Sequence, residues 1–251
     1  MNDRDILRIA LEQSAIDSAC SPEAFMGSTN RVFVSTNDSR ARRYLELPYS
    51  CDLVSYGSCV VASVSGELKA AISEYIGKYR PEECFETPQI HELQHRLSSF
   101  GQSIRFMAEY WLPNMKEIKP LSCDFELRFL CRDEFAGLYL PEWSNALCKK
   151  RAELDVLTIA AFDGSRMVGM AGCSMDCETM WQIGVDVLPK YRRMGIASAM
   201  TSRLALEVLG MDIVPFYCCA WANMGSARNA IRSGFRPAWA QLTAKGDASK
   251  R

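Results

Sequence analysis

The most informative stretch of the sequence is residues 185–197, Val185-Asp186-Val187-Leu188-Pro189-Lys190-Tyr191-Arg192-Arg193-Met194-Gly195-Ile196-Ala197. It is typical of a strand that ends at a proline, followed by a helix that opens at a glycine. The first N–H groups of a helix lack partners within it, and the helix dipole favours an anion beside them. Gly195 leaves room for close approach to the backbone, and Arg192 and Arg193 add positive charge. The stretch therefore predicts a pyrophosphate cradle.

Working outward, hydrophobic periodicity predicts the remaining elements. Strands are expected at residues 31–35, 53–65, 103–112, 125–131, 156–162, 166–175, 180–188, 213–222 and 235–243. Helices are expected at residues 67–79, 88–100 and 195–209, with a short one between Asn223, as N-cap, and Gly234. Asp163-Gly164 suits a hairpin turn. This order predicts an α/β (α+β) fold, with a mixed, mostly antiparallel sheet flanked by helices.

A candidate domain boundary lies at residues 113–120, which are polar and bracketed by prolines. We expect a smaller N-terminal α/β domain at residues 1–120 and a second domain at residues 121–251. The first could be a lid or a degenerate copy of the second.

The composition excludes several classes of partner. Lys and Arg number 29 against 30 Asp and Glu, which argues against nucleic acid or an anionic membrane as the main partner. No apolar stretch approaches the roughly 20 residues of a membrane span, and residues 1–20 lack a signal-peptide core. The 11 cysteines are an odd number placed in apolar runs, which is typical of reduced thiols, so we expect a cytoplasmic protein.

Two motifs together resemble the GNAT superfamily of N-acetyltransferases. Residues 192–197 fit the family's Arg/Gln-x-x-Gly-x-Gly/Ala signature, and Val185, Val187 and Pro189 match the hydrophobic strand before it. Asn223 and Gly234-Phe235 match the family's asparagine after the next strand and its Gly-Phe helix end. The resemblance covers the C-terminal half, and the layout with an N-terminal extension is similar to a subgroup of bacterial GNAT proteins.

The resemblance implies acetyl-CoA as cosubstrate and no metal. Backbone amides of residues 193–198 should hold the pyrophosphate, and the edge of the strand at residues 185–187 should pair with the pantetheine arm where two strands splay apart. A backbone N–H near Val187 should stabilise the oxyanion. The residues expected to contact the cosubstrate are Val185, Val187, Arg192, Arg193, Met194, Gly195, Ile196, Ala197, Ser198 and Asn223.

The resemblance also implies direct attack on the thioester by a primary amine of a small molecule, in a protein that we expect to form a homodimer. The family often places a tyrosine acid four residues before Gly-Phe, but Ala230 stands there. Ser226, one turn earlier, is a substitute, although a serine at a helix start also bonds backbone. Glu178 is our candidate base, with Asp176 and Glu142 as alternatives; each is also explained as a solvated carboxylate.

Two other readings stay open. Ala230 also suits an inactive acyl-CoA sensor or scaffold. Residues 91–95, with His91, Glu92 and His95, match the His-Glu-x-x-His pattern of zinc proteases, although the chain has only 2 histidines to serve as ligands. Trp143, Trp181 and Trp221 could line an apolar acceptor pocket, or pack in the core.

Overall fold

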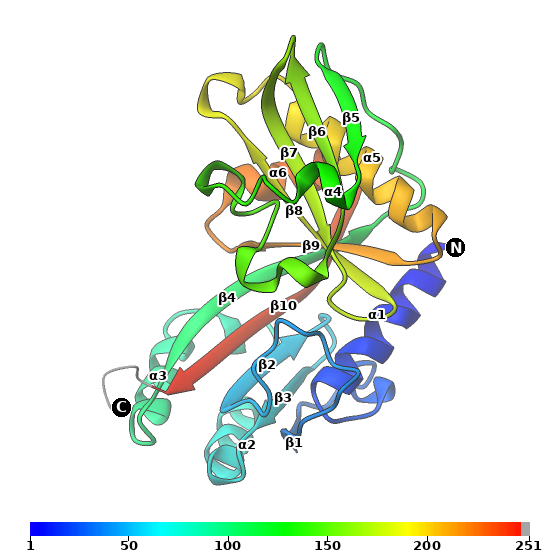
Figure 1. Ribbon diagram of the computed structural model, residues 1–251. Helices are drawn as coiled ribbons and strands as arrows, with labels where there is room; N and C mark the ends of the chain where they lie inside the picture. Colours follow the sequence, from blue (N-terminus) through cyan, green and yellow to red (C-terminus); the bar gives the residue numbers. More distant parts are fainter. Residues whose placement is uncertain (247–251) are drawn as a thin grey trace. The chain divides into compact units, whose positions relative to one another are not determined.

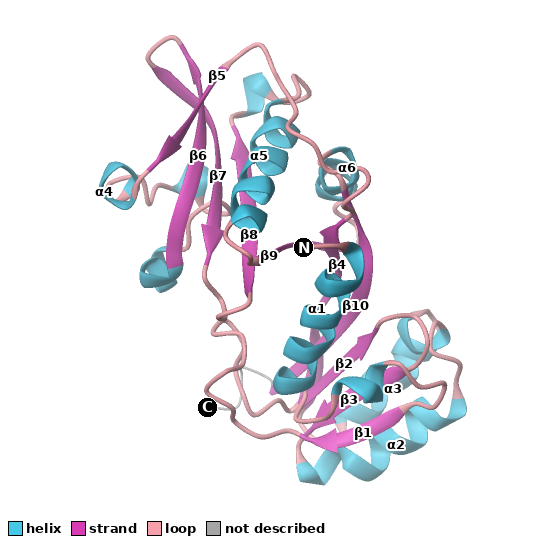
Figure 2. Cartoon of the chain, turned by 90° about the vertical axis from the view of Figure 1, so that its right-hand side faces the viewer, coloured by secondary structure: helices cyan, strands magenta, loops and turns pink. Residues whose placement is uncertain are grey.

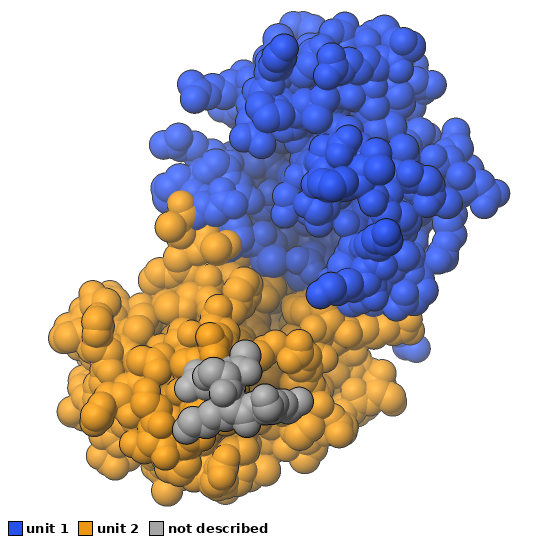
Figure 3. Space-filling view, turned by 60° about the vertical axis from the view of Figure 1, so that its left-hand side comes forward, with its two compact units in different colours: residues 1–9, 111–219, 223–237 blue, residues 10–110, 220–222, 238–251 orange. Residues whose placement is uncertain are grey.

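The computed structural model describes residues 1–246, which form two compact units (Figures 1 and 3). Unit 1 comprises residues 1–9, 111–219 and 223–237, and unit 2 comprises residues 10–110, 220–222 and the chain from residue 238 onward. The chain therefore passes between the units several times. The expected boundary near residue 120 falls inside unit 1, and as a boundary between folding domains it stays a prediction.

Unit 1 is built on five strands in the order β9-β8-β7-β6-β5. The strands are β5 (Glu126–Leu130), β6 (Asp155–Asp163), β7 (Arg166–Ser174), β8 (Met180–Val187) and β9 (Val214–Ala220). Neighbours from β5 to β8 are antiparallel, whereas β8 and β9 are parallel. The helices are α4 (Arg132–Phe135), α5 (Ile196–Gly210) and α6 (Met224–Arg232), with 3₁₀ turns at Pro141–Trp143, Lys149–Leu154 and Pro189–Tyr191. The predicted mixed, mostly antiparallel sheet with flanking helices is confirmed.

Two apolar cores cover the two faces of this sheet. Helix α5 lies along β7 and β8 (Figure 2), and its Ile196, Met200 and Leu204 are buried against Ile183. On the other face Trp143, Ala146 and Leu147 pack with Met170 and Phe162. The sheet is therefore fixed from both sides around β8.

Unit 2 carries five strands in the order β1-β3-β2-β10-β4. They are β1 (Arg31–Val34), β2 (Cys51–Ser55), β3 (Val60–Val64), β4 (Gln102–Pro113) and β10 (Phe235–Gly246); β4 and β10 each have one end in unit 1. Strand β3 is parallel to β1 and antiparallel to β2, which is antiparallel to β10. Helices α2 (Lys69–Lys78) and α3 (Gln89–Ser98) bury Ile72, Tyr75 and Leu93 in the core of this unit. Short 3₁₀ turns lie at Pro22–Phe25, Gly66–Leu68 and Glu83–Phe85.

Two features of the N-terminal part differ from the expectations. The single strand expected at residues 53–65 is wrong in extent, because a turn around Gly57, with φ of 102°, divides it into β2 and β3. Residues 3–17, to which no element was assigned, form helix α1 (Asp3–Asp17), with Ile6 and Ala10 buried. None of the described helices is long and apolar enough to cross a bilayer.

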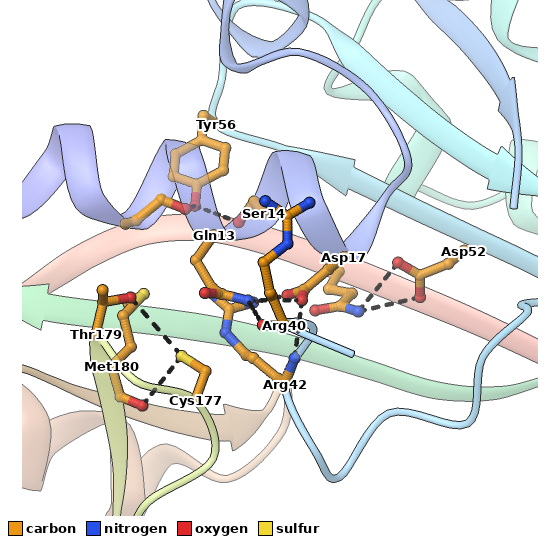
Figure 4. Close-up of polar contacts among 12 residues, drawn as sticks. Gln13, Ser14, Asp17, Arg40, Arg42, Asp52, Tyr56, Cys177, Thr179 and Met180 are labelled. Atoms are coloured by element: carbon orange, nitrogen blue, oxygen red, sulfur yellow. Dashed lines mark hydrogen bonds and ion pairs between the residues drawn. The ribbon is translucent and has the colours of Figure 1, made fainter. Parts of the chain in front are cut away.

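A buried polar cluster joins α1 to the sheet of unit 2 (Figure 4). Arg42 forms an ion pair with Asp17 at 2.7 Å, and Gln13 donates to the same carboxylate at 3.0 Å. Asp52, on β2, accepts hydrogen bonds from two β10 side chains, Gln241 and Thr243. Burial raises the pKa of Asp52 to about 7, although the bonds from Thr243 and Gln241 oppose the shift.

This shift predicts a stability that falls as pH rises from about 4 to about 7. Folding takes up a proton at Asp52, because its folded pKa of about 7 exceeds its ordinary value of 3.8. In the parent protein we expect the free energy of unfolding to fall by on the order of 2–4 kcal/mol over this pH range. The substitution Asp52→Asn should abolish this fall. Urea unfolding at several pH values measures it, with the exposed Glu67→Gln as control. Parallel pH curves for Asp52→Asn and the parent would contradict the prediction.

Candidate active site

Strands β8 and β9 part in the middle of unit 1. They pair in register from Met180–Val214 to Ile183–Tyr217, and no further pairing follows. Strand β8 nevertheless continues to Val187 and keeps its pairing with β7 as far as Gly169. Among the strands of residues 1–246, none pairs with the second edge of residues 184–187, in keeping with the splayed strands that the resemblance implies.

The backbone groups at this open edge can be assigned from the alternation of strand hydrogen bonds. The N–H of Leu188 donates to the carbonyl oxygen of Val168, next to β7, at 3.0 Å. Successive residues of a strand point these groups to opposite edges, so the N–H and C=O of Val185 and Val187 point away from β7. In keeping with this, Arg192 Nε donates to the Val187 carbonyl oxygen at 3.2 Å. The backbone N–H groups of Val185 and Val187 thus point into the space between β8 and β9, which we call the gap.

The predicted cradle lies where β8 leads into α5. After the 3₁₀ turn at Pro189–Tyr191, Arg193 and Gly195 adopt positive φ values of 67° and 81°. Gly195 is the N-cap of α5, and within the described part of the chain no side chain caps this helix. The first amides of α5, from Ile196 to Ser198, are thus open to an anion. A Cβ at Gly195 would meet only Cys123, at 4.0 Å, so the space above it is open.

The side chains around the cradle are arranged to suit an anionic ligand. Arg192, Arg193 and Met194 are exposed, whereas Ile196 is buried beneath them as an anchor in the core. Ser198 is buried and donates its hydroxyl to the Gly195 carbonyl oxygen at 3.1 Å. The side chain of Ser198 therefore stabilises the turn, and its backbone N–H is the group that remains for a ligand.

Helix α6 follows β9 along the chain. Asn223 is its N-cap, as predicted, and accepts the N–H of Ser226 at 3.1 Å. At the other end Gly234 has φ of 89°, and a Cβ there would lie 2.5 Å from the backbone of Ile118. Glycine is therefore required before Phe235 both by conformation and by space.

A tyrosine that the sequence analysis missed lies at the point where the strands part. The hydroxyl of Tyr217 is 2.7 Å from the hydroxyl of Ser226. Burial raises the pKa of Tyr217, against a smaller opposing effect of its bond to Ser226, so it stays protonated at neutral pH. Ala230 is fully buried in the core. The structure thus places a tyrosine hydroxyl beside our candidate acid, although on a strand instead of a helix.

The carboxylates expected as bases are dispersed. Glu178 is exposed in the β7–β8 connection, five residues before the last paired residue, Ile183, and at the opposite end of β8 from the cradle. Asp176 is buried in an ion pair with Arg151 at 2.9 Å. Glu142 is exposed in a 3₁₀ turn. None of these three carboxylates lies on a strand at the point where the pairing of β8 and β9 ends. The role of Glu178 as the base stays a prediction.

A loop covering the other face of β8 is held by a carboxylate. Asp186 accepts the N–H groups of Asn145 and Ala146 at 2.8 and 3.0 Å, and the Asn145 side-chain amide at 2.6 Å. Cβ atoms at Gly184 and Gly172 would lie 1.9 Å from the carbonyl oxygens of Asn145 and Ala146 respectively. Only glycine admits the loop this close to the sheet.

The three candidate tryptophans differ in their surroundings. Trp143 is buried in the core beneath the loop, and Trp181 is partly buried against the core that includes α5. Trp221 is 40% exposed and stacks on Phe85 in unit 2. Trp221 is therefore the one of the three whose ring is largely available to a ligand.

The His-Glu-x-x-His segment lies on α3. The Glu92 carboxylate accepts hydrogen bonds from Tyr79 and Lys78 and pairs with Arg96. These bonds, that of Tyr79 first, lower the pKa of Glu92 to about 2, which is unsuited to a general base. Across residues 1–246, no cluster of three or more His, Cys, Asp or Glu side chains is arranged to hold a metal ion.

Residues 125–234 match the model of the acetyltransferase (GNAT) family. Among solved structures, a GCN5-related N-acetyltransferase-like protein from Streptococcus suis is 17% identical, with a TM-score of 0.46, over 64% of this chain and 68% of that one. A GCN5-related N-acetyltransferase from Kribbella flavida is 13% identical, with a TM-score of 0.46, over 62% and 64% of the two chains. An acetyltransferase from the GNAT family of Colwellia psychrerythraea is 12% identical, with a TM-score of 0.45, over 61% and 62%. A comparison with curated proteins finds none that matches.

The close packing of the loop on β8 predicts a cost for any side chain at Gly184. We expect Gly184→Ala to lower the unfolding free energy by about 1–3 kcal/mol, because its Cβ would overlap the Asn145 carbonyl oxygen. Gly137→Ala is the control, since no atom lies within 4 Å of a Cβ there. Thermal unfolding of both variants makes the comparison; equal melting temperatures would contradict the predicted overlap.

Proposed function

We propose that the protein transfers an acetyl group from acetyl-CoA to a primary amine of a small molecule, because residues 125–234 match the model of the acetyltransferase (GNAT) family. The observation that carries the proposal is the open edge of β8 leading directly into the uncapped start of α5. We further propose a cytoplasmic homodimer that requires neither nucleic acid nor a membrane.

The residues present fit this cosubstrate at each part of its length. The amides of residues 193–198 and the charges of Arg192 and Arg193 suit a pyrophosphate. Val185 and Val187 offer backbone groups with which an extended chain containing amides can pair as an added strand. Asn223 is the N-cap of α6, the helix that follows β9. When bound, acetyl-CoA supplies a thioester activated for attack by an amine.

Catalysis in this proposal depends on position and on fixed donors. The gap would hold both reactants, so that the amine attacks directly, without a covalent enzyme intermediate. The N–H of Val187 is available to stabilise negative charge on the thioester oxygen, because the strand is already held by β7 and the loop at Asp186. The β8 backbone thus serves both for binding and for charge stabilisation.

The departing sulfur needs a proton or a hydrogen bond. We assign this role to the paired hydroxyls of Ser226 and Tyr217, with Ser226 facing the sulfur and Tyr217 donating to Ser226. The raised pKa of Tyr217 keeps its proton available at neutral pH. Glu178 remains the proposed base, and its exposure would let it exchange protons with solvent.

A second candidate function is an acyl-CoA sensor that binds without turnover. It is favoured by Ala230, which stands where the family often has its acid and is fully buried. Both functions require the cradle for binding. Only the transferase also requires the hydroxyl pair to protonate the departing sulfur. Free thiol released from acetyl-CoA in the presence of a panel of amines separates them.

Gly195→Glu tests the cradle. Any side chain at φ of 81° is strained, so Gly195→Ala is the matched control that carries the strain without the charge. We expect Gly195→Glu to weaken CoA binding at least tenfold more than Gly195→Ala, because the carboxylate repels the pyrophosphate. Calorimetric titration with CoA gives both affinities. Equal affinities for the two variants would place the pyrophosphate elsewhere.

Tyr217→Phe and Ser226→Ala test the hydroxyl pair. We expect each to lower kcat by about 10- to 100-fold, with CoA affinity unchanged within about threefold, since the pair acts on the leaving group. Tyr139→Phe is the control, because its hydroxyl donates to the Ala152 carbonyl oxygen and interacts with Asp155, neither of which belongs to the proposed site. Thiol release at saturating amine is the measurement. A kcat that stays at the parental value in both variants would remove the pair from catalysis.

A further inference from the structure

Helix α3 of unit 2 carries both histidines of the chain, four residues apart on its exposed face. His91 and His95 are exposed, whereas Leu93 and Leu97 lie on the opposite face of α3, buried in the core of unit 2. Side chains at positions i and i+4 of a helix are neighbours, with Cβ atoms about 5–6 Å apart. The two imidazoles therefore project from neighbouring positions on one face of the helix, and neither belongs to the residues assigned above to the cosubstrate.

The two rings are not engaged by the rest of the described chain. Across residues 1–246, neither imidazole is joined to another residue by a hydrogen bond or an ion pair. Each exposed ring can thus turn about its side-chain torsions and direct a nitrogen toward a common point above the helix. Imidazole is the commonest metal ligand among protein side chains, and a pair at this spacing can bind one metal ion from a single helix.

Glu92, the residue between the histidines that would be the base of a zinc protease, is held by other side chains. Its carboxylate pairs with Lys78, the last residue of α2, at 2.9 Å and with Arg96 at 2.9 Å. It also accepts a hydrogen bond from Tyr79. These bonds fix α3 to the end of α2 and leave the carboxylate poorly placed to activate a metal-bound water. The two histidines are therefore suited to binding a metal ion, without a base for hydrolysis beside it.

The charges of the network around Glu92 balance. Arg96 pairs with Glu74 at 2.8 Å as well as with Glu92, and Lys78 pairs with Glu92. The two cations of this network are thus matched by two carboxylates. A divalent cation that approaches the histidines meets no uncompensated positive charge from Lys78 or Arg96.

We propose that His91 and His95 form a binding site for a divalent transition-metal ion, with water completing its coordination. Imidazole suits Ni²⁺, Cu²⁺ and Zn²⁺, whereas Mg²⁺ and Ca²⁺ prefer oxygen ligands. Because structural zinc sites use four protein ligands, a site with two binds its metal reversibly. The required spacing exists only while α3 is helical, so the bound ion also stabilises the folded state. This inference goes beyond the proposed acetyl transfer and does not depend on it.

Calorimetric titration with Ni²⁺ tests the site, on protein without a histidine tag and with reduced thiols. Ni²⁺ is the probe because imidazole suits it, whereas thiolates, which the 11 cysteines could supply, select Zn²⁺ and Cu(I). We expect one Ni²⁺ per chain, with an affinity at least tenfold lower in His91→Ala and in His95→Ala. Mg²⁺ should not compete. Ni²⁺ should raise the melting temperature of the parent more than that of either variant, and without metal the three melting temperatures should agree.

The matched control moves one histidine and keeps their number. The double substitution of His95→Ala with Ser99→His, at the C-cap of α3, leaves histidines eight positions apart. The helical rise separates them by about 12 Å along the axis, too far to share one ion. This variant should bind Ni²⁺ as weakly as His95→Ala alone.

Two kinds of result would overturn the inference. One is a parent that does not bind Ni²⁺, or parental affinity in a single variant or in the double variant. The other is Ni²⁺ binding that thiol alkylation abolishes and the histidine substitutions leave unchanged, which would assign the ion to cysteines. Acetyl transfer has no part in these measurements, so failure of the proposed function leaves the metal site standing, and the reverse.

Discussion

The site in unit 1 depends on the loss of pairing between β8 and β9 after Ile183 and Tyr217. An unpaired strand edge exposes backbone donors and acceptors that otherwise favour another strand. Here β8 is held straight beyond this point by β7 on its other edge and by two layers packed on its faces. The open edge is therefore rigid, and rigidity is what allows a backbone N–H to stabilise charge without reorganising.

The glycines around β8 each solve a different spatial problem. Gly195 gives the N-cap of α5 a positive φ, and Gly234 does the same at the end of α6, where the backbone of Ile118 also excludes a Cβ. Gly184 has no unusual φ, but it admits the loop held by Asp186 onto the sheet. Glycine is thus required at these positions for different structural reasons. Only the glycines next to helix ends could be recognised from local sequence patterns.

Local signals explain how much of the structure could be predicted. The Asp163-Gly164 turn, the strand ending before Pro189 and the cap at Asn223 were all found, because each depends on neighbouring residues. The division of residues 53–65 at Gly57 was missed, since every residue of β2 and β3 is buried and neither strand shows the alternation of apolar and polar residues that would mark its limits. The contact of Asp186 with Asn145 joins residues about 40 positions apart, and no local pattern could reveal it. Helix α1 was missed because its buried face includes the polar residues Gln13, Ser14 and Asp17, which weaken the apolar periodicity.

The proposed hydroxyl pair illustrates why a motif alone does not locate a candidate acid. A motif assigns a role to a position, and Ala230 at that position left open whether another group, such as Ser226, serves as the acid. The chemistry, however, requires only a protonated hydroxyl near the parting strands, and any element that reaches this point can supply it. Tyr217 reaches it from β9 because it is the last residue paired with β8, and Ser226 from the first turn of α6 because Asn223 fixes that turn. In the proposed mechanism two hydroxyls on neighbouring elements take the place of one on a helix, and the raised pKa of Tyr217 keeps it protonated well above neutral pH.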